Sequence, residues 1–269
     1  MRRILTATIT ALMLLLAVGI PAAAIIGGEP DGDRHPYVGM VWGSAGAGEY
    51  AWACSGTLIA PTVFLTAGHC TQLAEEVDAP VYVTFDSTSD FDPDEGVRAA
   101  SVHTHPDICI ACSKKLGLPH LVTYDVGVVI LAEPVTDVGF GVLPEAGVVD
   151  ALVKQARLTT VGYGIRDFEH GGGPPQGVGL GERYFAHVRY VNVTNRIGEM
   201  FIKHSANTSQ GTGGTCNGDS GGPVFLPDQE TVVGITSFGA QAAGQCTSIS
   251  YAQRVDLLKV LVWLGGFLD

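Results

Sequence analysis

The chain is short of positive charge. Its 269 residues include 15 Lys and Arg against 27 Asp and Glu, which gives a formal net charge of −12. An acidic protein is repelled by the phosphates of nucleic acids and by the head groups of anionic lipids. We therefore expect neither nucleic acid nor a stable membrane association among its interactions.

Long apolar runs are also scarce. The first three residues are Met-Arg-Arg, an apolar stretch covers 11–18, and small residues occupy 22–24. This order predicts a secretory signal peptide over residues 1–24 and an extracellular, secreted protein. An uncleaved membrane anchor is the alternative, but the stretch is short and the residues before it include Thr6, Thr8 and Thr10. The apolar residues 256–264 are too few to span a bilayer.

Helical periodicity is rare as well, and we expect only residues 256–268 to form a helix, with a short helical turn after Cys70. Short β-rich runs between turn signals are frequent, which is typical of an all-β barrel or sandwich. The runs are Val38–Trp42, Ser55–Ile59, Val63–Ala67, Val81–Phe85, Val126–Leu131, Arg157–Tyr163, Val188–Val193, Gly222–Leu226 and Val232–Phe238.

The most informative motif is Gly218-Asp219-Ser220-Gly221-Gly222-Pro223. A serine becomes a good nucleophile when a base takes its proton and N–H groups stabilise the oxyanion that forms. The surrounding glycines allow sharp turns and a close approach of the backbone to a reacting carbonyl. A Gly-rich turn between strands is the structural alternative.

Two further motifs favour the chemical interpretation. His69 lies in Leu65-Thr66-Ala67-Gly68-His69-Cys70, at the end of an apolar run, and Asp125 opens the apolar run 126–131. An ionised carboxylate at the start of a buried strand needs a partner, and an imidazole N–H can supply it. Asp86 and Asp107 also lie between His69 and Ser220, but each is in a loop.

These motifs resemble those of the trypsin/chymotrypsin family of serine proteases, together with Ile25-Ile26-Gly27-Gly28 and the chain order His, Asp, Ser. The resemblance extends over most of residues 25–269 and is weaker at 86–120 and 165–215. It implies one domain of two packed six-stranded Greek-key barrels that join near 135–154. A C-terminal helix would pack against the second barrel.

The resemblance also implies the catalytic roles. Ser220 would be the nucleophile, His69 the general base, and Asp125 the group that orients and stabilises the imidazole. The N–H groups of Gly218 and Ser220 would form the oxyanion hole. Ser237 would hydrogen-bond Asp125.

Substrate binding is implied for a second set of residues. The segment 237–239 would pair with the substrate backbone as an added strand. Gly214 falls at the base of the pocket for the P1 side chain, where trypsin-like members carry an acid, so we expect a small to medium apolar P1 residue, with an aromatic one as the alternative. Asp228 or Glu230 reaching the pocket would change that expectation. The substrate-binding residues are Gly214, Thr215, Ser237, Phe238, Gly239 and Ile249.

Activation is implied by the same family pattern. An amine released at Ile25 would pair with Asp219, and a cut after Ala24 would release it directly. A cut after Ala22 or Ala23 with later trimming is one alternative, and Asp219 as a simple turn cap is another. Gly68 stands where the family commonly has Ala, a change that we expect to be harmless.

Six cysteines in an exported chain suggest three disulfides, for which the sequence permits fifteen pairings. The resemblance implies a pair of Cys54 with Cys70 and a pair of Cys216 with Cys246. Cys109 and Cys112 remain for a local third bridge. A zinc site made by these two with His103, His105 and His120 is the alternative.

Residues 86–96 form an acidic segment. We expect a solvated loop and no cofactor, with calcium as the alternative because hard cations prefer several oxygen ligands. The acidic residues are Asp86, Asp90, Asp92, Asp94 and Glu95.

The sequence as a whole predicts a secreted, monomeric serine endopeptidase that acts on peptides or proteins and is open to protein inhibitors. An esterase with the same triad and a non-catalytic binding module are the alternatives. The absence of the family's further disulfides fits a bacterial source.

Overall fold

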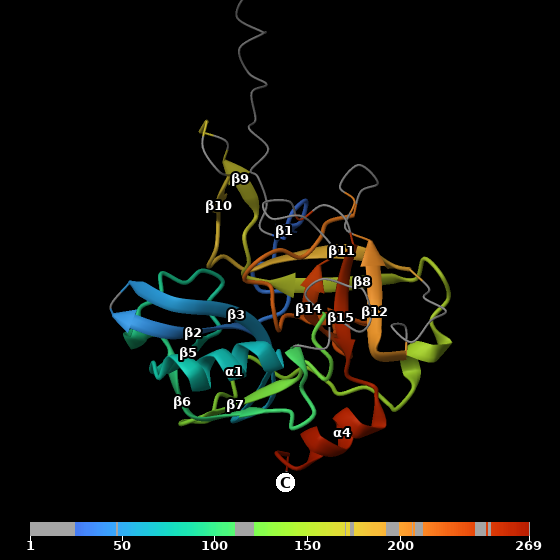
Figure 1. Ribbon diagram of the computed structural model, residues 1–269, viewed down its shortest axis with the longest axis horizontal. Helices are drawn as coiled ribbons and strands as arrows, with labels where there is room; N and C mark the ends of the chain where they lie inside the picture. The colour runs from blue at the N-terminus through green and yellow to red at the C-terminus, as the bar shows by residue number, and fades with distance from the viewer. Residues whose placement is uncertain are drawn as a thin grey trace, which may run out of the picture.

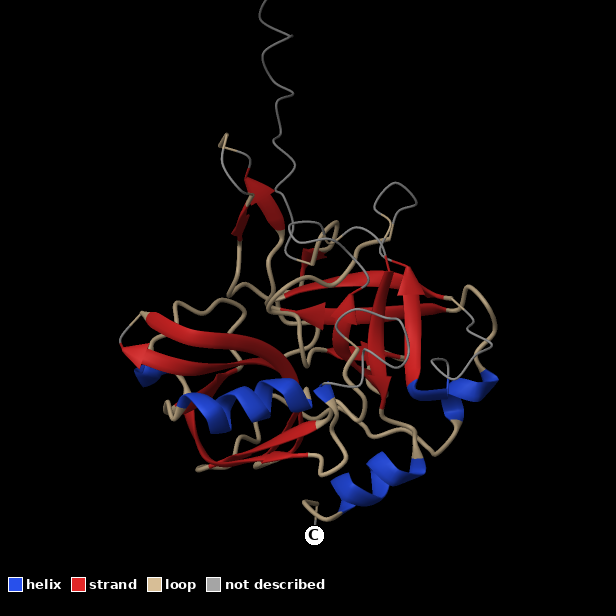
Figure 2. Ribbon diagram, in the orientation of Figure 1, coloured by secondary structure: helices blue, strands red, loops and turns tan. Residues whose placement is uncertain are grey.

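The computed structural model describes residues 25–46, 48–110, 121–169, 171–172, 175–191, 199–205, 207, 212–239, 246 and 249–268. The expected signal peptide, Cys112 and His120 lie outside these residues. The described chain consists mostly of antiparallel strands in two barrels that lie side by side (Figures 1 and 2). The expected fold of two six-stranded barrels with a C-terminal helix is therefore confirmed.

The first barrel closes in the order β2-β3-β4-β7-β6-β5. Its strand β7 is almost wholly buried, because the barrel interior lies on one side and helix α1 on the other. At Gly127 a Cβ atom would lie 2.6 Å from Thr71 of α1, so this strand needs glycine there. The strands are β2 (Val38–Gly46), β3 (Glu49–Ala60), β4 (Val63–Thr66), β5 (Val81–Thr84), β6 (Val97–Thr104) and β7 (Gly127–Leu131).

The second barrel runs β11-β12-β15-β14-β13-β8 and closes through pairing of β11 with β8. A short strand β1 (Glu29–Pro30) adds to β11, and the hairpin β9 (Asp167–Glu169) and β10 (Gln176–Val178) projects from the body (Figure 1). Its interior is apolar, with Leu158, Val188 and Val224 fully buried. The barrel strands are β8 (Arg157–Gly162), β11 (Tyr184–Tyr190), β12 (Phe201–Ser205), β13 (Pro223–Phe225), β14 (Val232–Gly239) and β15 (Ile249–Arg254).

The helices are few. Helix α1 (Gly68–Val77) begins before Cys70, not after it, and α4 (Leu258–Gly265) lies within the expected C-terminal range. The described chain also contains two 3₁₀ turns, η1 (Pro93–Glu95) and η3 (Val148–Ala151), and η3 lies in the connection between the barrels. No helix of the described chain has the length and apolar character needed to cross a membrane.

The packing of α4 differs from the expectation. The Trp263 ring lies 5.1 Å from the ring of His105, and the Phe267 ring lies 5.1 Å from that of His103 in β6. Lys259 also forms an ion pair with Asp107 at 2.5 Å. The aromatic side chains of this last segment therefore contact the first barrel and the segment that leads to Asp125, whereas packing against the second barrel was expected.

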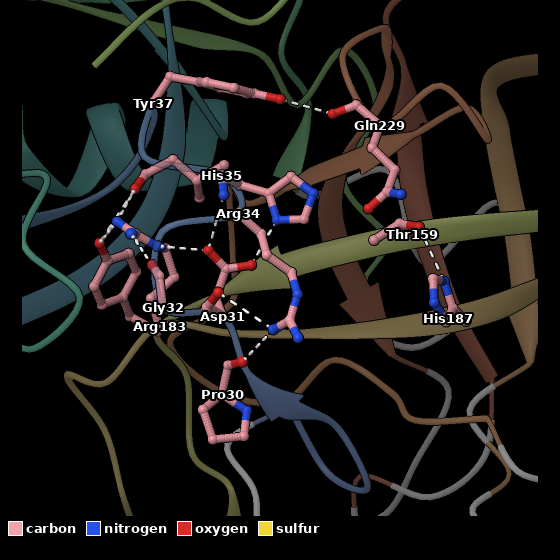
Figure 3. A network of polar contacts seen from close by, with 12 residues as sticks. Pro30, Asp31, Gly32, Arg34, His35, Tyr37, Thr159, Arg183, His187 and Gln229 are labelled. Carbon is pink, nitrogen blue, oxygen red and sulfur yellow. Dashed lines mark hydrogen bonds and ion pairs between the residues drawn. The ribbon is translucent and has the colours of Figure 1, made fainter. Parts of the chain in front are cut away.

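The segment that follows β1 crosses between the barrels. Asp31 and His35 lie in it, each 1% exposed, and their polar contacts extend to Arg183 at the start of β11 (Figure 3). Buried polar contacts with Arg183 thus hold the segment after β1 against the second barrel.

Candidate active site

Asp125 and His69 meet at the boundary between the barrels. Asp125 lies just before β7 and is fully buried, and His69 is the second residue of α1. The carboxylate accepts two hydrogen bonds from His69, one from the backbone N and one from Nδ1, both at 2.8 Å. Ser237 Oγ of β14 donates a third at 2.5 Å. The second barrel thus contributes directly to the orientation of a carboxylate in the first.

Asp125 and His69 each change the pKa of the other. Burial opposes the charge of the imidazolium, but Asp125 outweighs it and raises the pKa of His69 above 6.5. Burial alone would raise the pKa of Asp125, yet the charge of His69 and the hydrogen bonds from His69 and Ser237 lower it below 3.8. The aspartate therefore stays ionised, and His69 becomes a stronger base than a free imidazole.

Ser220 lies on the loop that leads into β13, next to the histidine loop. Its carbonyl accepts a hydrogen bond from Ser55 N of β3 at 2.7 Å. At Gly221 a Cβ atom would lie 2.8 Å from Ala67 N and 2.1 Å from Thr66 Oγ1, and φ is +83°, so only glycine allows this approach. Ser220 Oγ makes no hydrogen bond to the described residues, and catalytic contacts of this kind often tighten only with substrate.

Around Ser220, two backbone N–H groups are not used by hydrogen bonds within the part of the chain that the structure describes. The carbonyl of Asn217 accepts from Ile165 N at 2.8 Å, and that of Asp219 accepts from Gly222 N at 2.9 Å. In a trans peptide the C=O and the following N–H point in opposite directions. The N–H groups of Gly218 and Ser220 therefore point away from these donors, and neither has a backbone acceptor in the described chain. Donor N–H groups that are not used by the fold are one feature that an oxyanion hole requires.

Asp219 is buried beside this loop. Its carboxylate accepts from Gly164 N and Cys216 N, both at 2.8 Å. Burial raises its pKa to about 7, although the two N–H groups act in the opposite direction. Ile25 is also fully buried, against Tyr184 and Ala186. In the full-length chain its nitrogen belongs to a peptide bond with Ala24, so the expected ion pair requires cleavage.

The expected substrate residues lie along β14, β15 and the segment before Cys216. Gly214 and Thr215 are buried, and Gly214 N donates to Ile26 O at 2.9 Å. Phe238 stacks on Tyr251 with 4.7 Å between ring centres, and Ile249 packs against the same aromatic cluster. These residues give the region an apolar wall.

Asp228 occupies the turn between β13 and β14. Its carboxylate accepts from Glu230 N, Thr231 N and Thr231 Oγ1. The eight residues of β14 separate this turn from Gly239 by about 25 Å at 3.3 Å per residue. The turn thus lies at the far end of β14 from Gly239, which does not favour the alternative in which Asp228 or Glu230 lines the P1 pocket.

The cysteines are paired wherever the structure describes them. Cys54 is bonded to Cys70, and Cys216 to Cys246. Cys109 is also in a disulfide, so its sulfur is not a thiolate that could bind zinc. Its expected partner, Cys112, lies outside the described residues.

A metal ion needs several ligand atoms that lie close to one another. Among the described residues, the one group of three side chains with ligand atoms within 4.8 Å of one another is Cys54, His69 and Cys70, and both cysteines are in a disulfide. In the acidic segment the nearby Asp90 raises the pKa of Glu95. The described acidic side chains do not converge on a site with three ligands.

Sequence reasoning missed two residues of the site. Gln253 of β15 accepts from Asp125 N at 3.2 Å and donates to Met200 O, and Ser55 contacts the Ser220 loop. Neither lies in a motif, because both contacts join strands far apart in the chain. Gly68, which was expected to be a harmless replacement of the family's usual Ala, also lies in a tight place: a Cβ atom there would lie 2.9 Å from both Val126 N and Val126 O. The backbone at the start of α1 thus touches the chain just before β7.

Comparisons with known proteins agree with this geometry. The Trypsin family model matches residues 25–264. Brachyurin of Leptuca pugilator is 30% identical over 206 residues, covering 70% of this chain and 76% of brachyurin. Human chymotrypsin-like elastase family member 3B is 27% identical over 233 residues, covering 81% and 79% of the two chains. Both are animal proteins, and they give no support to a bacterial source.

Solved structures show the same fold. HL collagenase superposes with a TM-score of 0.67 at 18% identity, covering 91% of this chain and 99% of its own. Human heparin binding protein superposes with a TM-score of 0.61, also at 18% identity, covering 90% and 95%. Together with the family match, these findings show that the chain belongs to the trypsin family and is a serine endopeptidase.

Proposed function

We propose that this protein is a secreted endopeptidase that cleaves peptide bonds through an acyl-enzyme. Ser220 Oγ attacks the scissile carbonyl while His69 Nε2 accepts its proton. His69 then returns the proton to the leaving amine, and a water molecule hydrolyses the acyl-enzyme by the same steps. Asp125, held by Ser237, fixes the imidazole tautomer and stabilises the imidazolium.

One observation supports this most strongly: two N–H groups beside Ser220 have no backbone acceptor among the described residues, and the serine loop lies next to the loop of a buried Asp–His pair. The N–H groups of Gly218 and Ser220 would donate to the oxyanion of the tetrahedral intermediate. Loss of one such donor typically costs about two to three orders of magnitude in kcat.

Peptide substrates are favoured by the edge of β14. Pairing with β13 ends at Ile235, and the backbone bonds to the Ser220 loop end at Thr236. Residues 237–239 pair on their other side with β15, so their free edge could accept a substrate strand. An apolar P1 residue fits Gly214 at the pocket base, because no carboxylate is there to pair with Arg or Lys.

Maturation would follow from secretion. Removal of residues 1–24 frees the amine of Ile25, which would reach Asp219 and lower its pKa. The released enzyme would act as a monomer on peptides or proteins and would be a target for protein inhibitors.

The test is labelling with a serine-directed fluorophosphonate probe. The secreted protein should be labelled once per chain, and Ser220→Ala should not be labelled at all. Asp125→Ala should be labelled at a rate lower by orders of magnitude, because the nucleophile loses its activated base. Labelling that persists in Ser220→Ala would refute the proposed nucleophile.

A further inference from the structure

We propose that Ser55 is a positioning residue for the oxyanion hole, an inference that rests on the proposed function. Ser55 belongs to β3 of the first barrel and is fully buried. It lies against the loop of Ser220, which belongs to the second barrel. Its contacts reach the peptide groups on both sides of the nucleophile.

Two carbonyls of the loop are held by Ser55. Its backbone N donates to Ser220 O at 2.7 Å, and its Oγ donates to Gly218 O at 2.9 Å. Gly222 N donates to the carbonyl of Asp219, which lies between these two, and Ile165 N donates to that of Asn217, which precedes them. Four consecutive carbonyls, from residue 217 to residue 220, therefore each have a donor, and Ser55 supplies two of the four.

The direction of the Ser55 hydroxyl is fixed by a third contact. Tyr163 N donates to Ser55 Oγ at 2.9 Å. A backbone N–H can only donate, so the single hydroxyl proton is left for Gly218 O. The Ser55 carbonyl accepts from Thr66 Oγ1 at 2.7 Å, which completes the polar contacts of the residue.

Holding these carbonyls fixes the donors of the oxyanion hole. Gly218 has φ of +94°, a region that glycine enters and leaves with little steric cost. The hydrogen bond to its carbonyl restricts rotation of the next peptide, which carries Asp219 N–H. Gly222 N holds the carbonyl of Asp219, and the N–H of Ser220 belongs to the same peptide. This N–H therefore keeps its direction, opposite to that carbonyl.

Ser55 also links the nucleophile to the base. The preceding residue, Cys54, is bonded to Cys70, which directly follows His69. One dipeptide of β3 therefore contacts the histidine loop through a disulfide and the serine loop through hydrogen bonds. A shift between the barrels would change the distance between nucleophile and base, and this dipeptide opposes it.

The experiment compares Ser55→Ala with Thr57→Val. Ser55→Ala keeps the backbone N–H but loses the hydroxyl. Thr57 lies two residues along the same strand and is buried, and its Oγ1 has no partner in the described chain, so Thr57→Val removes a hydroxyl without removing a hydrogen bond. Active sites are first counted by stoichiometric fluorophosphonate labelling, so that unfolded protein does not contribute.

Per labelled site, Ser55→Ala should lower kcat on a peptide amide about tenfold with KM within about twofold, because the oxyanion forms only in the transition state. The affinity of a peptide boronate, which mimics that oxyanion, should fall by the same factor, and Thr57→Val should match the parent. A parent-like kcat and boronate affinity in Ser55→Ala would overturn the inference. So would a rise in KM by the same factor as the fall in kcat. If Ser55→Ala does not fold, Ser55→Cys, with a weaker donor, should show the same loss.

The result also separates the two proposals. A parent protein that is not labelled at Ser220 contradicts the proposed function itself. A parent that is labelled and active, with Ser55→Ala equally active, contradicts only the role of Ser55.

Discussion

Arg183 donates from Nε to Asp31 Oδ2 at 3.0 Å, and the two side chains are 2% and 0% exposed. The other oxygen of Asp31 lies 2.5 Å from His35 Nδ1. The remaining guanidinium donors reach backbone carbonyls that include Val38 O in the first barrel, and also the Tyr163 hydroxyl in the second. One buried ion pair thus joins the segment after Ile25 to both barrels (Figure 3).

Asp31→Asn should destabilise the protein. It removes the charge opposite a buried guanidinium, and breaking such a pair typically costs about 3–5 kcal/mol in the free energy of unfolding. Urea unfolding of an inactive Ser220→Ala background measures it without self-digestion. Glu182→Gln is the matched control, because Glu182 pairs with Arg166 at 2.9 Å with both side chains about one third exposed, so its loss should cost less than about 1 kcal/mol. Equal costs for the two variants would show that burial does not strengthen the Asp31 pair.

Gly68→Ala should damage both stability and activity. The added Cβ would lie 2.9 Å from the backbone of Val126 and 2.7 Å from Ile108 Cδ1, so the start of α1 must move away from Val126 and carry His69 with it. Overpacking of this kind costs about 1–3 kcal/mol, and a displaced base lowers kcat by at least tenfold. Gly171→Ala is the control, since no described atom lies within 4 Å of a Cβ there. Parent-like kcat in Gly68→Ala would show that the helix accommodates the methyl group without moving the histidine.

The sequence predicted the strands that are apolar and mostly buried, such as β4, β7 and β14. It missed β6, β12 and β15. Strand β6 is rich in Ala and partly exposed, so its residues show little β preference, and β15 carries Gln253 and Arg254, which look like surface residues. Their side chains are nevertheless buried, because each makes hydrogen bonds or ion pairs inside the protein.

The residues of the site also divide into those that the sequence predicts and those that only the structure reveals. Ser220, His69 and Asp125 stand in motifs whose residue types carry the chemistry, so they could be proposed from the sequence. Ser55 and Gln253 act through side-chain and backbone hydrogen bonds to residues far away in the sequence, and no local pattern encodes such a contact. The expected range Val188–Val193 was displaced for a related reason. Strand β11 begins at Tyr184, since its register is set by pairing with β8.

The pH dependence of kcat/KM should show an acid limb with a midpoint above 6.5. Asp125 raises the pKa of His69, so the imidazole stays protonated to a higher pH, and the protonated form cannot accept the Ser220 proton. In Asp125→Asn the carboxylate no longer raises the pKa of His69, while burial still lowers it. The midpoint of the acid limb should therefore fall, and kcat should drop by about 10⁴. The measurement is kcat/KM from pH 5 to 9 for both proteins. A parent midpoint at or below 6.5 would contradict the coupling.

Asp219 should make stability depend on pH in a protein that keeps residues before Ile25. Its pKa is about 7 in the folded protein and 3.8 when the side chain is exposed to water, so the folded state binds the proton more tightly and stability falls as pH rises from about 4 to 7. The effect amounts to at most about 4 kcal/mol and should be absent in Asp219→Asn. Urea unfolding of Ser220→Ala proteins from pH 4 to 8 measures it.

The matching experiment uses a protein that begins at Ile25, without the preceding residues. Its ammonium would lower the pKa of Asp219, so the difference between parent and Asp219→Asn should no longer fall over this pH range. The same slope with and without the preceding residues would show that the Ile25 amine does not reach the carboxylate.

Ile249→Gly should broaden the P1 preference from small apolar residues toward Phe and Tyr. Ile249 is the first residue of β15 and packs in the aromatic cluster of Phe238 and Tyr251, where its side chain would narrow the far wall of the pocket. A steric change of one or more methylene groups is worth about 1–3 kcal/mol in such a pocket, so kcat/KM for Phe should rise about tenfold or more relative to Ala. A peptide library with every residue at P1 measures both proteins, and Val153→Ala, at a side chain that is 73% exposed, is the control.

The parent should cleave poorly after Arg and Lys, because a cation in a pocket with Gly214 at its base would lack a partner. A dominant preference for Arg or Lys, or an unchanged profile in Ile249→Gly, would show that other residues form the pocket.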